Sequence, residues 1–310
     1  MQVISVKKAV FPIAGLGTRL LPFTKAVPKE MMPILGKPLI QHSVEEALDA
    51  GCKTLIFVTS DAKPAIRAHF EPNLELEKSL INNGKSDIAN EISNILPSDV
   101  ECIYVNQEEQ LGLGHAVLCA EKAVGNHPFC VILPDDFIHA QHNQNLSRLV
   151  KAFQETGCSQ LSVMSVNGPD ISKYGVVEPG KRSNQVYRLI EKPSLEMAPS
   201  KIASIGRYVF TNSIFETIKS IGVGHGGELQ LADAIDRLAR NGEVEMVLLE
   251  GSRFDCGTER GYLNAILNLA DRRKRVRENT LEKDIPNLEA SKYDKVLEMV
   301  DEKFFTEKTF

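Results

Sequence analysis

Residues 8–22, Lys-Ala-Val-Phe-Pro-Ile-Ala-Gly-Leu-Gly-Thr-Arg-Leu-Leu-Pro, decide the fold, because a short apolar run leads directly into a glycine turn that carries a cation. The apolar run 9–14 is typical of a buried β-strand. The glycines of Gly15-Leu-Gly17 allow backbone N–H groups to approach a phosphate, and the start of a following helix would add a favourable dipole. Arg19, and Lys29 further along the chain, supply the positive charge that a polyphosphate requires. The stretch therefore predicts a nucleoside triphosphate site.

Two commoner glycine motifs do not fit this stretch. A dinucleotide fingerprint needs a third glycine at the position of Leu20 and an acidic residue about twenty positions on, where residues 34–37 offer none. A P-loop needs Gly-Lys-Ser/Thr at a fixed spacing, and the chain has no such string. Gly15-Leu-Gly17 alone is equally typical of a tight turn that needs positive φ. Thr18-Arg19 and Pro28-Lys29-Glu30 beside it favour the phosphate site.

The composition indicates the class of protein. Hydrophobic residues make up 43% of the 310 positions, enough for a large globular core. The net charge of −5 argues against a general nucleic-acid binder, so a phosphate site must be local. No apolar run approaches the roughly 18 residues of a membrane span, and no signal-peptide pattern is found. The six cysteines form no C-x-x-C pair and predict reduced core residues in a cytoplasmic protein.

Strand and helix patterns alternate along the chain. Strands are expected at 9–14, 54–59, 102–105, 129–133, 161–166, 174–178, 186–190, 203–210 and 244–249. Helices are expected at 40–50, 64–70, 114–124, 145–156, 213–220, 228–241, 259–277 and 288–300, with short surface helices in an insertion at 71–97. This order predicts an α/β nucleotide-binding domain whose later strands add a mixed-sheet region, followed by a helical C-terminus.

Carboxylates follow apolar strands at two places. Asp135 and Asp136 end the run 129–133, where strand ends face the ligand crevice of an open α/β sheet. Such oxygen ligands suit Mg²⁺, and Asp135, nearest the strand, is the better candidate, although both residues also fit a turn. Asp255 follows the strand 244–249 and is a candidate second ligand. Thr258, just beyond it, fits a helix N-cap, and both roles are compatible.

Two further segments combine polar groups near strand ends. Gln107 carries an amide, which offers the donor and the acceptor needed to recognise a pyrimidine edge, although most surface glutamines are simply solvated. Glu191 and Lys192 pair a carboxylate with a cation, which suits a sugar phosphate: hydroxyls on Glu191 and phosphate on Lys192. An exposed ion pair of little energetic value is the alternative for Glu191 and Lys192.

Taken in order, these residues resemble the sugar-phosphate nucleotidylyltransferase family, in its bacterial UTP–glucose-1-phosphate uridylyltransferase branch. The resemblance covers almost the whole chain. It lies in Phe11-Pro-Ile-Ala-Gly-Leu-Gly-Thr-Arg19, Val27-Pro-Lys-Glu-Met-Met-Pro33, Gln107, Leu111-Gly-Leu-Gly-His-Ala116, Leu133-Pro-Asp135, Tyr174-Gly-Val-Val177, Glu191-Lys-Pro193, Ile205-Gly-Arg-Tyr208, Gly227-Glu-Leu-Gln-Leu-Ala-Asp233 and Phe254-Asp-Cys-Gly257. The Val-Pro-Lys-Glu-Met and Gly-Arg-Tyr strings resemble the uridylyl branch more than the thymidylyl one.

The resemblance implies a Rossmann-like mixed sheet of the nucleotide-diphospho-sugar transferase type. It implies a catalytic domain over 1–277, with a nucleotide-binding part near 1–145 and a sugar-binding part near 146–257. The segment 278–310 would serve packing or oligomerisation. The implied partners are UTP and glucose 1-phosphate, with Mg²⁺ as cofactor, and neither nucleic acid nor membrane. A homodimer or homotetramer is expected.

Site roles also follow from the resemblance, residue by residue. The nucleotide would contact Ala14, Gly15, Gly17, Thr18, Glu30, Gln107 and Gly112. Arg19, Lys29 and Lys192 would be the catalytic cations, with Arg19 and Lys29 on the triphosphate and Lys192 on the sugar phosphate. Gly175 and Glu191 would hold glucose, and Asp135 and Asp255 the metal. Asp136 departs from the apolar residue expected there, which leaves open which of the two adjacent acids faces Mg²⁺.

The implied reaction joins UTP and glucose 1-phosphate to give UDP-glucose and pyrophosphate. Because the attacking phosphate oxygen is already anionic, no general base and no covalent enzyme intermediate are required, and catalysis rests on positioning and charge neutralisation. Two alternatives stay open at this point: the same chemistry with dTTP, and a non-catalytic nucleotide-sugar sensor. The retention of Arg19, Lys29, Asp135, Lys192 and Asp255 argues against the sensor.

Overall fold

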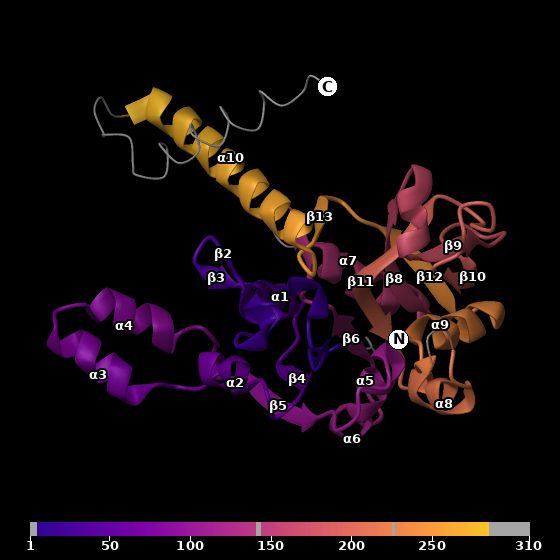
Figure 1. The fold of residues 1–310 in the computed structure, drawn as a ribbon, viewed down its shortest axis with the longest axis horizontal. Helices are drawn as coiled ribbons and strands as arrows, with labels where there is room; N and C mark the ends of the chain where they lie inside the picture. The colour runs from indigo at the N-terminus through magenta and orange to yellow at the C-terminus, as the bar shows by residue number, and fades with distance from the viewer. Residues whose placement is uncertain (1–4, 141–143, 225–226, 285–310) are drawn as a thin grey trace. The chain divides into compact units, whose positions relative to one another are not determined.

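A nine-stranded mixed sheet forms the centre of the molecule (Figure 1). The computed structural model describes residues 5–140, 144–224 and 227–284. Seven strands follow one another across the sheet: β10 (Val186–Glu191), β9 (Gly175–Pro179), β11 (Ile202–Phe210), β6 (Phe129–Ile132), β1 (Lys8–Pro12), β4 (Thr54–Thr59) and β5 (Glu101–Asn106). β8 (Ser159–Ser165) pairs with β11, and β12 (Val244–Leu248) pairs with β8. The structure confirms the predicted α/β mixed sheet.

The parallel strands β6, β1, β4 and β5 place their carboxyl ends at one edge of the sheet. Three of the predicted site segments leave from this edge: the turn that follows β1, the stretch after β5 that begins at Gln107, and the Leu133–Asp135 stretch after β6. The turn that carries Lys29 comes later in the connection that follows β1. β11 joins antiparallel to β6 and connects this parallel half to β9 and β10. The sheet therefore continues without a break from the half that carries the predicted nucleotide residues into the half that carries Gly175 and Glu191.

Both faces of the sheet are buried, as continuous apolar strands require. Because side chains alternate along a strand, Val10, Ile56 and Val131 pack on one face, with helices α5, α8 and α9. Phe11, Phe57 and their neighbours pack on the other face, with α1, α2 and α7. These helices are α1 (Leu39–Asp49), α2 (Pro64–Phe70), α5 (Leu113–Cys119), α7 (Gln144–Thr156), α8 (Ser213–Ser220) and α9 (Leu231–Arg240). The short helix α6 (Glu121–Val124) continues α5, so the single helix expected at 114–124 is divided at Ala120.

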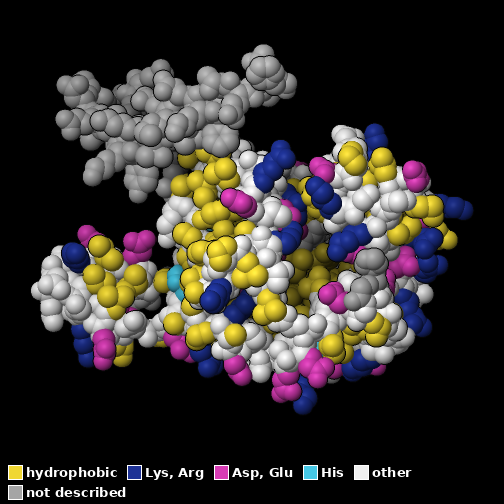
Figure 2. All heavy atoms as spheres, in the orientation of Figure 1, with side chains coloured by type: hydrophobic (Ala, Val, Ile, Leu, Met, Phe, Trp, Pro, Cys, Tyr) yellow, Lys and Arg dark blue, Asp and Glu magenta, His cyan; other side chains and the backbone are white. Residues whose placement is uncertain are grey.

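The polar insertion after α2 forms a helical hairpin of α3 (Leu74–Asn82) and α4 (Ser86–Ser93), which confirms the short surface helices predicted at 71–97. The hairpin lies beyond α2, away from the sheet (Figure 1). It exposes four large hydrophobic side chains, those of Leu74, Leu76, Ile81 and Ile88. Figure 2 shows hydrophobic side chains gathered on this hairpin.

Two small antiparallel ribbons were not predicted. β2 (Pro33–Ile34) pairs with β3 (Lys37–Pro38). β7 (Asp136–His139) pairs with β13 (Ser252–Asp255), so that Asp136 lies opposite Asp255. The sequence predicts Asp255 after the strand 244–249, whereas in the structure Asp255 ends β13. The β7–β13 ribbon brings the ends of two distant segments together beside the sheet edge.

The chain divides into two compact units, Met1–Ala265 and Ile266–Phe310, and the first contains every predicted site residue. The division falls inside helix α10 (Glu259–Asp284), which continues past the expected end at 277. The second expected C-terminal helix, at 288–300, lies outside the described residues. Among the described helices, none has the length and apolar character needed to cross a membrane.

Candidate active site

The turn after β1 is tighter than the sequence analysis expected. Gly17 adopts a left-handed conformation with φ of 66°, and its carbonyl accepts a hydrogen bond of 2.8 Å from the hydroxyl of Thr24. Only a 3₁₀ turn of three residues, η1 (Thr18–Leu20), follows, so the expected helix start and its dipole are wrong here. Leu21 precedes a proline and is extended, which ends the turn. Gly15 has no heavy atom within 4 Å of a Cβ built on it, so its backbone stays open to a ligand.

Lys29 and Asp135 form a close ion pair at the sheet edge. Lys29 begins the 3₁₀ turn η3 (Lys29–Met31), and its Nζ lies 2.6 Å from Oδ2 of Asp135. Burial acts to raise the pKa of Asp135, but the neighbouring Lys29 ammonium outweighs it, and the pKa lies below its usual value. Burial likewise acts to lower the pKa of Lys29, and Asp135 outweighs it, leaving that pKa raised. Both groups are therefore charged at neutral pH.

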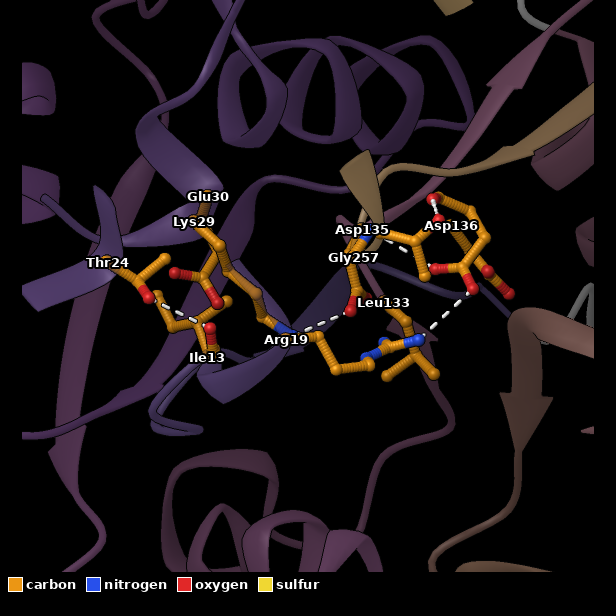
Figure 3. A network of polar contacts seen from close by, with 12 residues as sticks. Ile13, Arg19, Thr24, Lys29, Glu30, Leu133, Asp135, Asp136 and Gly257 are labelled. Atoms are coloured by element: carbon orange, nitrogen blue, oxygen red, sulfur yellow. Dashed lines mark hydrogen bonds and ion pairs between the residues drawn. The ribbon is translucent and has the colours of Figure 1, made fainter. Parts of the chain in front are cut away.

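Arg19 and Asp255 form a second ion pair beside the first. Nη1 of Arg19 lies 3.2 Å from Oδ2 of Asp255 at the end of β13. Gly257 faces groups of both pairs, and Figure 3 shows it next to Asp135. A Cβ on Gly257 would lie 2.5 Å from Arg19 Nη2, 3.0 Å from Asp135 Oδ2 and 3.1 Å from Asp255 Oδ1. The missing side chain thus leaves a small space that a cation and both candidate metal carboxylates face.

Both carboxylate oxygens of Asp136 have partners away from Gly257. Its Oδ2 accepts a hydrogen bond of 2.8 Å from the Gly206 backbone N–H, and its Oδ1 is ion-paired with Arg253. Arg253 also donates to the hydroxyl of Tyr174 at 2.8 Å and lies over the Tyr174 ring. Burial raises the pKa of Asp136 despite the Arg253 charge. Because both of its oxygens already have partners, Asp135 rather than Asp136 is the acid that faces the space beside Gly257.

The sugar-side residues come together through the β9–β10 pairing. Gly175 begins β9 and Glu191 ends β10, and the two lie directly opposite each other. A Cβ on Gly175 would lie 3.2 Å from Glu191 Oε2, so a larger residue would crowd the carboxylate. Lys192 has a φ of 44°, and its Nζ lies 3.5 Å from Glu191 Oε1. Its side chain is half-exposed, which leaves the ammonium available to a second anion.

A cavity of about 1040 Å³ connects these groups. Its walls include six of the predicted site residues, namely Arg19, Asp135, Gly175, Glu191, Lys192 and Asp255. Lys29 does not line this cavity, but its ammonium forms an ion pair with Asp135, which does. The predicted nucleotide-binding residues Ala14, Gly15, Gly17, Thr18, Glu30, Gln107 and Gly112 are not in its lining. The structure therefore groups Arg19 with the metal and sugar candidates in one cavity, and it leaves the nucleoside candidates outside the lining of that cavity.

The nucleoside candidates are held by contacts within the protein. The carbonyl of Ala14 accepts a hydrogen bond of 3.0 Å from the Gln110 side chain, which was not predicted to take part. Gly112 has a φ of 103°, and a Cβ there would lie 2.8 Å from that of Glu228. This glycine is thus also required for the close packing of two backbone segments. Glu30 is 1% exposed and forms a 2.9 Å ion pair with Lys63.

Two buried cations near the site, Lys63 and Arg207, were not predicted from the sequence to have a role. Lys63 contacts Glu30 and also donates to the carbonyl of Ile13, so it links η3 to the end of β1. Arg207, 1% exposed, donates to Glu46 at 2.8 Å and to the carbonyl of Leu133 at 2.9 Å. Arg207 could have been noticed, because it is the one charged residue in the apolar strand 203–210. Lys63 gave no comparable signal, because lysines in loops are usually exposed.

The residues fit a divalent cation in type and placement. Carboxylate oxygens are the ligands that Mg²⁺ prefers, and it usually takes one or two carboxylates, with substrate phosphates and water completing its shell. Asp135 and Asp255 offer two carboxylates to the space beside Gly257. Within the described residues, no group of three or more histidine, cysteine, aspartate or glutamate side chains is arranged to hold a metal. The donor set therefore suits an ion that arrives with a phosphate-bearing substrate.

Comparison with known proteins gives consistent matches. The family model for nucleotidyl transferase matches residues 8–272. The chain is 43% identical to a UTP–glucose-1-phosphate uridylyltransferase of Haemophilus ducreyi over 278 residues, which cover 86% of this chain and 94% of that protein. It is 41% identical to the enzyme of the same name from Escherichia coli, over 89% of this chain and 92% of that one.

A solved structure described as UDP-glucose pyrophosphorylase from Acinetobacter baumannii superposes with a TM-score of 0.81 at 37% identity. The match covers 90% of this chain and 100% of the other. A UTP-bound structure from the same organism matches with a TM-score of 0.79 at 35% identity, over 98% of this chain and 100% of the other. The likeness extends over nearly the whole of each chain.

Proposed function

Since this chain belongs to the nucleotidyl transferase family, as a UTP–glucose-1-phosphate uridylyltransferase, we propose that its cavity joins UTP and glucose 1-phosphate to give UDP-glucose and pyrophosphate. The observation that carries the proposal is the convergence of Arg19, Asp135 and Asp255 around Gly257, in one cavity with Glu191 and Lys192. A reaction between two phosphate esters needs these three elements together: cations, metal-binding oxygens and a sugar site.

The triphosphate would lie along the turn after β1. The open backbone at Gly15 and the turn Gly17-Thr18 supply N–H groups, while Arg19 and Lys29 supply positive charge. Ala14, Gln107 and Gly112 lie on the neighbouring strand ends and would hold the nucleoside. Arg19 and Lys29 would then stabilise the pyrophosphate as it leaves.

Charge balance supports a requirement for Mg²⁺. Arg19 is paired with Asp255 and Lys29 with Asp135, so the four side chains carry no net charge. A triphosphate that enters this site brings several negative charges and needs added positive charge. Asp135 and Asp255 would hold Mg²⁺ between them, and the ion would supply charge neutralisation on the phosphates.

The glucose 1-phosphate would lie at the β9–β10 end of the cavity. Glu191 offers acceptors for sugar hydroxyls, opposite the small surface of Gly175. Lys192 would bind the sugar phosphate and offset its repulsion from the nucleotide. The phosphate oxygen would then attack the α-phosphorus in line, without a covalent enzyme intermediate.

The reaction course can be tested with UTP that carries a chiral α-phosphorothioate. A single in-line attack inverts the configuration at phosphorus, so the UDP-glucose analogue formed with Mg²⁺ should be inverted. A retained configuration would indicate two displacements and a covalent intermediate, contrary to the proposal. Addition of EDTA should stop product formation, and turnover that continues without a divalent cation would contradict the metal assignment.

A further inference from the structure

Lys192 has a backbone conformation that its surroundings must hold. Its φ of 44° lies in the left-handed region, which a residue with a side chain adopts only at a cost in energy. Lys192 follows directly after β10, and its backbone N–H donates a hydrogen bond of 3.0 Å to the carbonyl of Tyr174, the residue before β9. This bond extends the pairing in which Glu191 lies opposite Gly175. The position of the Lys192 backbone therefore depends on Tyr174.

The side chain of Tyr174 is held by Arg253. Nη1 of Arg253 donates to the Tyr174 hydroxyl at 2.8 Å, and the guanidinium carbon lies 5.1 Å from the centre of the ring. Tyr174 is also partly buried against the small apolar cluster that contains Val176. A cation over an aromatic ring adds attraction to the hydrogen bond. Tyr174 thus binds Arg253 through its side chain and Lys192 through its carbonyl.

Arg253 is in turn fixed by the β7–β13 ribbon. It lies on β13 opposite Ile138 of β7, and its Nη2 is ion-paired with Oδ1 of Asp136. The side chains of Arg253 and Asp136 are only 10% and 12% exposed. The other oxygen of Asp136 accepts a hydrogen bond from the backbone N–H of Gly206, which belongs to β11. Arg253 is therefore anchored to both the ribbon and the nine-stranded sheet.

The contacts of Arg253 suit it to positioning rather than to binding a phosphate. Its charge is neutralised by Asp136, and each Nη already binds a side chain of the protein. Its Nε is shut off from solvent and has no partner among the described residues. Lys192, in contrast, is 53% exposed and lines the cavity. Lys192 is thus the cation that a sugar phosphate can reach, and Arg253 reaches Lys192 through Tyr174.

Resting on the proposed function, we infer that Arg253 is a positioning residue for the sugar phosphate: through Tyr174 it holds Lys192 where the ammonium meets the phosphate of glucose 1-phosphate. Because Asp136 anchors Arg253 and lies next to Asp135, the same contacts connect the sugar end of the cavity to the metal candidates. A displacement of about 1 Å in a positioned group can lower a rate a hundredfold, so the loss of one of these contacts should be measurable.

The test removes one hydroxyl group. Tyr174→Phe keeps the ring and its packing but breaks the hydrogen bond from Arg253. Pyrophosphate release is measured at saturating Mg²⁺, with UTP and glucose 1-phosphate varied in turn. We expect kcat/KM for glucose 1-phosphate to fall about five- to tenfold, the scale of one hydrogen bond to a charged group. The KM for UTP should not change, because the triphosphate is assigned to the turn after β1, outside these contacts.

A double-mutant cycle shows whether the effect passes through Lys192. In a Lys192→Ala background the ammonium is already absent, so Tyr174→Phe should change kcat/KM for glucose 1-phosphate by less than about twofold. Arg253→Met combined with Asp136→Asn leaves neither buried charge unpaired, and it should lower the same constant at least as much as Tyr174→Phe does. Tyr187→Phe, which removes an exposed hydroxyl on β10, is the matched control and should leave all constants unchanged.

The outcomes separate this inference from the proposed function. An unchanged kcat/KM for glucose 1-phosphate in folded Tyr174→Phe overturns the inference and leaves the proposed function standing. A loss that persists at full size in the Lys192→Ala background, or an equal rise in the KM for UTP, also overturns it. If the Arg253→Met, Asp136→Asn variant shows no cooperative thermal transition, the Tyr174→Phe cycle decides alone. If the unaltered chain releases no pyrophosphate from UTP and glucose 1-phosphate, the proposed function fails, and the inference fails with it.

Discussion

At the scale of single residues, Gly257 is the position where the smallest change should have the largest effect. A methyl group there would lie 2.5 Å from Arg19 Nη2 and about 3 Å from one oxygen of each candidate metal ligand. These neighbours are ends of side chains that can move, so Gly257→Ala should fold with a nearly unchanged melting temperature. Turnover should fall about a hundredfold or more, the scale of losing one preorganised electrostatic group.

A matched control for Gly257→Ala is Gly222→Ala, at an exposed glycine where a Cβ would meet nothing within 4 Å. Steady-state pyrophosphate release from both variants, with UTP, glucose 1-phosphate and Mg²⁺, checks the prediction. Normal turnover in Gly257→Ala would mean that the space beside Gly257 is not used in the reaction.

Lys192 gives a second prediction at this scale. Lys192→Ala should lower kcat about a hundredfold or more, because Lys192 is the cation proposed to bind the sugar phosphate and to offset its repulsion from the nucleotide. Lys173→Ala is the matched control: this lysine also lines the cavity, but it is mostly exposed and paired with Asp170. Equal kinetic effects of the two substitutions would argue against a specific role for Lys192.

The buried pair Lys63–Glu30 leads to a prediction about stability and its pH dependence. Burial raises the pKa of Glu30, although Lys63 opposes this. Lys63→Met should lower the free energy of unfolding by about 3–5 kcal/mol, because it leaves the Glu30 carboxylate buried and without that partner. Replacing both residues, as Lys63→Met with Glu30→Leu, should recover much of the loss. Urea denaturation of the two variants measures both effects.

The sign of the pH dependence follows from the raised pKa of Glu30. A carboxyl group with a raised folded-state pKa binds a proton more tightly in the folded chain than in the unfolded one, over a window that starts at the ordinary value of 4.5 and extends upward. Stability contributed by this group falls as the pH rises through that window. In Lys63→Met the free energy of unfolding should therefore be greater at pH 5 than at pH 8, relative to the double variant. An identical slope in both variants would contradict this account.

At the scale of secondary-structure elements, Arg207 connects β11 to α1 and to the end of β6. Its guanidinium binds Glu46 and the carbonyl of Leu133, two residues before Asp135. Arg207→Leu should lower the free energy of unfolding by about 3–5 kcal/mol, since Glu46 would stay buried without its partner. Removal of an exposed ion pair by Lys53→Ala should have a far smaller effect, because solvent screens the Lys53–Asp99 pair. Comparable losses in the two variants would contradict the structural role of Arg207.

The elements that could be predicted are those specified by local pattern. The apolar runs of β1, β4 and β6 were recognisable because buried parallel strands are apolar throughout, and the amphipathic helices follow from their periodicity. The ribbon of β7 and β13 was not recognisable, because its two four-residue strands are too short to show a clear pattern and pair across more than a hundred residues. Its consequence, that Asp255 ends a strand opposite Asp136, required the structure.

The same distinction applies to the candidate site. The cations and carboxylates were named from glycine turns and strand ends, and the structure gathers six of the named residues in one cavity. Sequence could not reveal which of Asp135 and Asp136 faces the space beside Gly257, because that depends on the contacts of Asp136 with Gly206 and Arg253. Nor could it reveal that Lys63 is the buried partner of Glu30. The expected homodimer or homotetramer stays a prediction.

At the scale of the whole molecule, one continuous mixed sheet carries both groups of candidate site residues. The parallel strands carry the nucleotide and metal candidates, and the antiparallel strands β9 and β10 carry the sugar candidates. Because β11 connects them through β6, the distance between the two groups of candidate residues is set by the core rather than by a flexible linker. Such fixed placement suits a reaction that depends on positioning and charge.

The most direct measurement is pyrophosphate release from the unaltered chain with Mg²⁺, over a panel of nucleoside triphosphates and sugar 1-phosphates that includes UTP, dTTP, CTP, ATP and GTP. The account predicts rapid release with UTP and glucose 1-phosphate, and much slower release with CTP or a purine nucleotide. Preferred use of dTTP would assign the chain to thymidylyl transfer. The absence of release from every pair would contradict the central claim, and would leave a protein that binds nucleotide sugars without making them.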